Sequence, residues 1–170
     1  GQDGVHLLGD RSNISNNSIS HCNQLGIRAV GDDETITSNI IRNIGVIPGQ
    51  AFNGANASAI AVAKNNCVIK YNTIENIGYC GIGLSSTADI ITIQNNFINN
   101  VLLTLNDGAA IYTVAEGISR KIDGNIILNV VGNTDGTPYP GRYIARGIYL
   151  DVNTTKTIIT NNTVANCSEA

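Results

Sequence analysis

The sequence predicts an all-β solenoid, a parallel β-helix of about six coils, from a repeated motif and its spacing. The motif is Asn-x-Ile-x-Asn, and its first Asn recurs at Asn17, Asn39, Asn72, Asn96, Asn125 and Asn162. Successive copies are 22, 33, 24, 29 and 37 residues apart. The shortest intervals set a period too short for a pair of helices but long enough for three short strands and three turns. Short runs in which Ile, Val and Thr alternate with polar residues favour the same fold.

Each coil is expected to contain three strands. We predict the first at 5–7, 27–29, 60–62, 82–84, 111–113 and 148–150. The second lies just before the first Asn of the motif, and the third is the motif itself. Since alternate residues of a strand share a face, the central residue of the motif points into the solenoid. This inward stack comprises Ile19, Ile41, Ile74, Ile98, Ile127 and Val164.

The first Asn of each motif is expected to form a ladder. Equivalent turns stack at the strand spacing of ~4.8 Å, so each side-chain amide can donate to the carbonyl of the next. Asn also tolerates a left-handed backbone better than most residues. We favour this structural role over a role for these amides as ligands or catalysts.

Composition narrows the range of partners. The 170 residues form one predicted domain, 1–170, with 14% charged residues and a net charge of −3. Basic clusters are lacking, so nucleic acid is not an expected partner, and no apolar run is long enough to predict a membrane span. The chain lacks Met and a leader-like start, and it stops where the next coil is due. We therefore expect a fragment of a longer chain, truncated at both ends, that continues into further coils.

The four cysteines are predicted to be free thiols that act as small apolar residues. Cys22 and Cys167 occupy equivalent positions five coils apart, and Cys67 and Cys80 lie on different sides of one coil, so neither pair can form a bridge. The sequence has no C-x-x-C motif, no His-rich cluster and no set of several Asp residues on neighbouring strands. It therefore predicts neither a metal site nor a cofactor.

Three insertions, at about 46–56, 102–106 and 133–146, lengthen the same turn, between the third strand and the first. Insertions confined to one face of a repeat protein often wall a binding surface, although tolerated surface drift would also produce them. The first strands would then form the floor of a groove. The outward residues of that floor are His6, Arg28, Ala61, Gly83, Tyr112 and Tyr149. Tyr faces suit sugar rings, but exposed strands also favour Tyr for other reasons.

Two carboxylates bracket the floor and are candidates for catalysis. Asp107 comes just before one first strand, in D-G-A-A-I-Y, and Asp151 just after the next, in G-I-Y-L-D. Cleavage of a glycosidic bond uses such a pair as general acid and as base or nucleophile. Arg146 could orient a substrate hydroxyl or hold Asp151 ionised. The pair is displaced by about seven positions along the strands, so Asp107 would have to fold back, and Asp-Gly is also an ordinary turn pair.

The whole chain resembles the right-handed parallel β-helix superfamily that includes pectate lyases, polygalacturonases and many bacterial polysaccharide-degrading enzymes. The segments at 107–112 and 147–151 are similar to segments of glycoside hydrolase family 141. That resemblance implies a polysaccharide substrate and acidic catalytic residues, here Asp107 and Asp151. The predicted first strands lack the N-T-D and D-D motifs that polygalacturonases carry.

Two classes of function follow from these observations. The first is a secreted, cell-surface or periplasmic glycoside hydrolase, bacterial in origin, with Asp107 and Asp151 as catalytic residues. Its substrate would contact His6, Arg28, Tyr112, Arg146 and Tyr149. The second is a non-catalytic β-helix that binds carbohydrate, as an adhesin or phage-tail module does, or a polysaccharide lyase.

Overall fold

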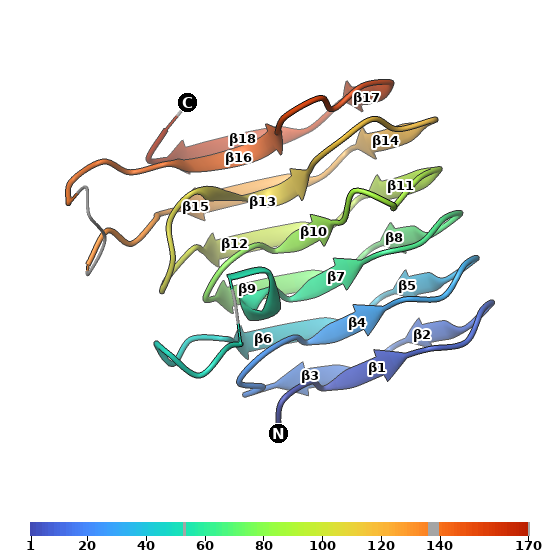
Figure 1. Ribbon diagram of the computed structural model, residues 1–170, viewed down its shortest axis with the longest axis horizontal. Coiled ribbons are helices and arrows are strands. Elements are labelled where there is room, and N and C mark those ends of the chain that lie inside the picture. The colour runs from blue at the N-terminus through green and yellow to red at the C-terminus, as the bar shows by residue number, and fades with distance from the viewer. Residues whose placement is uncertain (53, 136–139, 170) are drawn as a thin grey trace.

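The chain folds as a solenoid of three six-stranded parallel sheets, seen in a computed structural model that describes residues 1–52, 54–135 and 140–169 (Figure 1). Every third strand joins the same sheet, so each coil contributes one strand to each sheet. Sheet A comprises β1 (Val5–Leu7), β4 (Ile27–Ala29), β7 (Ile60–Val62), β10 (Ile82–Leu84), β13 (Gly108–Thr113) and β16 (Ala145–Leu150). Sheet B comprises β2 (Asn13–Ser15), β5 (Thr35–Thr37), β8 (Val68–Lys70), β11 (Ile91–Gln94), β14 (Arg120–Asp123) and β17 (Thr157–Thr160). Sheet C comprises β3 (Ser18–Ser20), β6 (Ile40–Ile44), β9 (Thr73–Ile77), β12 (Phe97–Val101), β15 (Ile126–Val130) and β18 (Thr163–Cys167).

The predicted strands and register are confirmed. Sheet A contains the six predicted first strands, with β13 and β16 each starting three residues earlier than expected. Its register aligns Arg28 with Ala61, Gly83 with Tyr112, and Tyr112 with Tyr149. One sheet face therefore carries the outward series read from the sequence.

The interior is a column of aliphatic side chains that is repeated in every coil. In each of the four central coils the middle residue of the motif is completely buried. Burying one such Ile contributes about 1.5–3 kcal/mol relative to leaving it exposed. The two ends of the stack differ, because Ile19 is 7% exposed and Val164, in the last coil, is 45% exposed. The prediction of an inward Val164 thus holds for its register but not for its burial.

The Asn ladder is present and unbroken. Each side-chain Oδ1 accepts the Nδ2 group of the ladder Asn in the preceding coil at 2.9–3.0 Å, from Asn17 through to Asn162. The same oxygen also accepts the backbone N–H of that preceding Asn. One buried side-chain amide thereby provides hydrogen-bond partners for a backbone N–H and for a side-chain amide of the neighbouring coil.

The left-handed conformation that we expected at the ladder Asn lies elsewhere. Positive φ angles occur at the residue just before it, as at Tyr71 (57°) and Asn95 (54°). They recur at the second Asn of the motif, as at Asn76 (58°) and Asn100 (60°). Several of these second residues form their own side-chain ladder, in which Asn100 Nδ2 donates to Asn76 Oδ1 at 2.7 Å. The motif therefore needs Asn twice for different reasons, once as a buried hydrogen-bond relay and once as a left-handed bend.

The three insertions all lie in the turn between sheet C and sheet A, as predicted. Figure 1 shows them projecting from one side of the solenoid, between β6 and β7, β12 and β13, and β15 and β16. The first contains the short 3-10 helix η1 (Gly54–Ala57). Asn53 in the first insertion and residues 136–139 in the third lie outside the described residues.

All four cysteines are free, which confirms the thiol prediction. Cys22, Cys67 and Cys80 are buried, and Cys167 is half-buried in the last coil. Burial raises the pKa of Cys67 to about 11 and that of Cys80 to about 12. These thiols are therefore poor nucleophiles at neutral pH.

Candidate functional site

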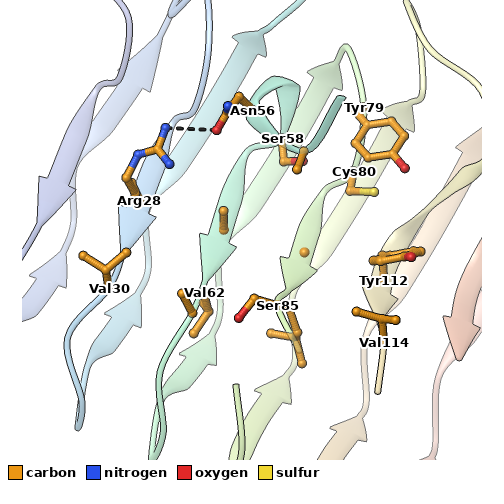
Figure 2. A pocket seen from close by; sticks show the side chains of 15 residues that line it. Arg28, Val30, Asn56, Ser58, Val62, Tyr79, Cys80, Ser85, Tyr112 and Val114 are labelled. Carbon is orange, nitrogen blue, oxygen red and sulfur yellow. Dashed lines mark hydrogen bonds between the residues drawn. The ribbon is translucent and has the colours of Figure 1, made fainter. Parts of the chain in front are cut away.

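A groove of about 380 Å³ lies on the outer face of sheet A. It crosses β4, β7, β10 and β13, so it runs along the solenoid axis and across the strands. Figure 2 shows Arg28 and Asn56 on one side of it and Tyr79, Cys80 and Tyr112 on the other. Its lining is mostly apolar with a few polar groups, which is typical of a binding site for a small molecule or a chain segment.

The floor is open because two consecutive coils lack large outward side chains. Ala61 and Gly83 stand where the flanking coils carry Arg28 and Tyr112. A Cβ added to Gly83 would meet nothing within 4 Å. The hollow is therefore a consequence of two residues that the sequence analysis had already identified as the small members of the outward series.

The first insertion closes one side of the groove. Ala55 and Asn56 of η1 line it, and Asn56 Oδ1 accepts a hydrogen bond from Nη2 of Arg28 at 3.0 Å. Arg28 Nε also donates to Asp3 Oδ2 at 2.8 Å. The guanidinium is thus fixed at the wall by two acceptors.

Two tyrosines form the opposite wall, and each is anchored at one of the two predicted catalytic residues. The Tyr79 hydroxyl donates to the backbone oxygen of Asp107 at 2.6 Å. The Tyr112 hydroxyl donates to Oδ2 of Asp151 at 2.5 Å. Burial is the main reason why the pKa of both tyrosines lies above its ordinary value, so both keep their protons and act as donors.

Tyr79 was not found by the sequence analysis. It lies three residues before Ile82, the first residue of the predicted first strand, and three other coils have a small residue at the equivalent position: Ala57, Gly108 and Ala145. Its ring lies on Gly108, where an added Cβ would come within 2.7 Å of the ring. The signal was a single aromatic residue at a position that is Gln, Ala or Gly in the other coils.

The backbones of Asp107 and Asp151 lie at opposite ends of the paired strands β13 and β16. Asp107 precedes Gly108, which pairs with Ala145, whereas Asp151 follows Leu150 at the other end of β16. Seven residues of nearly extended chain separate the two backbone positions, about 23 Å at ~3.3 Å per residue. A pair that acts on one glycosidic bond needs its carboxyl groups within ~5–9.5 Å. The charge of Asp107 does reach the Tyr149 hydroxyl, which also bonds to Asp151, so the catalytic pair stays a prediction.

Asp151 is nevertheless held in its ionised form. The Tyr112 hydroxyl, the backbone N–H of Val152 and the Tyr149 hydroxyl hold the pKa of this carboxyl below its ordinary value. The charge of Arg146 adds a smaller effect of the same sign. An acid in this state can accept a proton but is poorly suited to donate one.

The remaining predicted residues lie around the groove rather than in its lining. Tyr149 packs edge-on against Tyr112, in a T-shaped contact with ring centroids 5.4 Å apart at 84°. Arg146 lies over the Tyr149 ring at 4.1 Å and pairs with Glu169 at 3.0 Å. His6 lies beyond Arg28, with Nδ1 3.9 Å from Asp3.

The third insertion differs from our prediction of a second wall. Its described residues do not line the groove and instead contact the short second insertion. Asn106 Nδ2 donates to the Arg142 carbonyl, and Asn106 Oδ1 accepts the N–H of Ile144. No group of three or more His, Cys, Asp or Glu side chains placed to hold a metal occurs within 1–52, 54–135 and 140–169. That part of the chain also contains no helix long and apolar enough to cross a membrane.

Residues 1–170 match the family model described as a right-handed β-helix region. The chain belongs to this family. The three parallel sheets, with one strand of each per coil, agree with that assignment. Neither the curated proteins nor the solved structures that were searched gave a match.

Proposed function

We propose that this β-helix binds a carbohydrate chain along the groove of sheet A. The observation that carries the proposal is the open floor at Ala61 and Gly83, bounded by Arg28 on one side and Tyr112 on the other. The groove crosses four strands in a row at ~4.8 Å spacing. A linear polymer of rings can therefore meet one coil after another.

The lining offers both kinds of contact that a sugar needs. Apolar CH faces can pack on the half-buried rings of Tyr79 and Tyr112 and on Val30, Leu84 and Val114. Hydroxyls can bond to the polar groups at the edges, such as Ser58 and Ser85. A secreted or cell-surface location, bacterial in origin, would place such a groove where polysaccharides occur.

Blocking the floor tests this proposal directly. Gly83→Leu fills the groove, and its Cβ has free space, so the fold should be unchanged. We expect the affinity for the best ligand of a polysaccharide panel to fall by about tenfold or more, measured by isothermal titration. Gly9→Leu, which also adds a side chain in open space but outside the lining, is the matched control. Unchanged affinity in Gly83→Leu would exclude this groove as the binding site.

Glycoside hydrolysis is a second candidate, and the ionised Asp151 beside wall residue Tyr112 is what favours it. The resemblance to glycoside hydrolase family 141 would add Asp107 as its partner, but the backbone separation of about 23 Å along the strands argues against a direct pair. Cleavage of a polysaccharide panel by wild type, Asp107→Asn and Asp151→Asn separates the cases. Comparable loss in both variants would support the pair. Activity retained in Asp107→Asn would exclude it, and a polysaccharide lyase would be recognised by its unsaturated product.

A further inference from the structure

The charged groups around the groove are arranged so that its cationic side chain is already neutralised. Arg28 is the sole charged side chain among the described residues that line the groove. Its partner Asp3 lies 2.8 Å away with a side chain that is 14% exposed. Because this pair is partly buried, solvent and salt screen it less than they would an exposed pair.

The donor edge of Arg28 is also occupied. An arginine clamps a carboxylate with two parallel N–H groups, one of which is often Nε. Here Nε donates to Asp3 and Nη2 donates to Asn56 Oδ1. A uronate carboxylate would have to displace Asp3 or Asn56 to gain the clamp that uses Nε, so only the N–H groups of Nη1 and the second N–H of Nη2 are left for it. A sugar hydroxyl needs a single remaining N–H.

The Tyr end of the groove carries an excess of negative charge. The cation there, Arg146, is paired with Glu169. Asp151 is bonded to wall residue Tyr112, and Asp107 is exposed at the foot of Tyr79. Arg146, Glu169, Asp151 and Asp107 together therefore leave a net charge of about −2 next to the wall tyrosines.

We propose that the groove selects uncharged sugar chains over polyuronates, and that Asp3 is the specificity-determining residue because it neutralises Arg28. This inference rests on the proposed carbohydrate-binding function and names its substrate class. Asp3 does not line the groove itself; it acts on the ligand through Arg28, whose guanidinium it positions and neutralises. Its Oδ1 also accepts the backbone N–H of Leu25 at 3.2 Å, which fixes the carboxylate beside the guanidinium.

The experiment compares two ligand classes of equal length. Binding of uncharged hexasaccharides (cello-, xylo-, manno- and galacto-hexaose) and of hexagalacturonate is measured by isothermal titration for the full chain. We expect the best uncharged hexaose to bind about tenfold or more tightly than hexagalacturonate. In Asp3→Asn this ratio should shrink by about fivefold, because a unit charge is removed next to Arg28. Asp10→Asn removes the same charge from an exposed turn outside the lining and should leave the ratio unchanged.

Salt gives an independent readout that does not depend on a variant folding. Raising the ionic strength from about 0.01 M to about 1 M shortens the Debye length from about 30 Å to about 3 Å. The preference for the uncharged chain should fall accordingly in the wild type. If hexagalacturonate binds as tightly as the uncharged chains at low salt, the charge selection is refuted while carbohydrate binding stands. An unchanged ratio in a folded Asp3→Asn refutes the role of Asp3. If neither ligand class binds, the proposed function itself fails, and this inference with it.

Discussion

Replacing Asn96 with Ala should destabilise the solenoid by about 3 kcal/mol, because this side chain serves three coils at once. Its Oδ1 accepts the backbone N–H and the Nδ2 group of Asn72, at 3.0 and 2.9 Å. Its own Nδ2 donates to Ile69 O, Gln94 O and Asn125 Oδ1. The residue is 1% exposed, so water cannot replace the lost partners without entering the bend.

The magnitude follows from the groups that are orphaned. The buried N–H of Asn72 loses the acceptor it has in the structure, which costs about 1–3 kcal/mol. The other lost bonds contribute about 0.5–1.5 kcal/mol each, reduced where a partner keeps a second contact. Asn72 Nδ2 keeps Ile36 O and Lys70 O, and Asn125 Oδ1 keeps the Asn96 N–H, so the total stays near 3 kcal/mol.

The assay is the free energy of unfolding from chemical denaturation followed by far-UV circular dichroism. Asn17→Ala is the matched control, because Asn17 occupies the same ladder position in the first coil but is exposed. It should cost under about 1 kcal/mol. If the two substitutions cost the same, the ladder does not act through buried hydrogen bonds and the reasoning is wrong.

Two further predictions concern titrating groups. Tyr112→Phe removes the largest cause of the lowered pKa of Asp151, so the pKa of that carboxyl should rise in a ¹³C NMR titration, whereas Tyr71→Phe should leave it unchanged. Because the pKa is lowered by folding, this bond stabilises the protein above the unfolded pKa, and the difference between variant and wild type should vanish as the pH falls through the folded pKa. Glu34 is fully buried and its pKa is raised, mainly by burial, so its ionised form destabilises the fold once the pH exceeds the unfolded value. Glu34→Gln should therefore be more stable than wild type at pH 7 but not at pH 3, in thermal melts at both values; an equal gain at pH 3 would contradict this reading.

The sequence predicted the strands and the ladder because both depend on local repeats. A period of 22–24 residues places Asn72 over Asn96 and Ile74 over Ile98 in any stack of equal coils, and parallel pairing then follows. The outward positions from Arg28 to Tyr149 follow from the same stacking, because successive side chains of a strand point to opposite faces. These features need no knowledge of the loops.

The residues of the site were harder to predict from the sequence, because the site depends on contacts that side chains make between coils. Tyr79 enters the wall because Gly108 leaves room for its ring. Asp3 reaches Arg28 across adjacent coils, at a sequence distance of 25 residues. Arg120 is another example: it points into the solenoid, 1% exposed, and donates to the carbonyls of Ala88, Val114 and Ala115. A charged residue on an inward strand position is acceptable here because the adjacent turn presents free carbonyls.

Because each coil supplies one row of the floor, the length of the groove is determined by the number of coils between its two charged ends. The coil that begins at Asn72 is 24 residues long and contributes β9, β10 and β11, including Gly83. Deleting it would bring the Ala61 row next to the Tyr112 row and shorten the floor by one strand spacing, ~4.8 Å. Duplicating it would lengthen the floor by the same step. A family of such proteins could therefore change the length of this groove by recombination between coils, while each ladder contact is restored at the new junction.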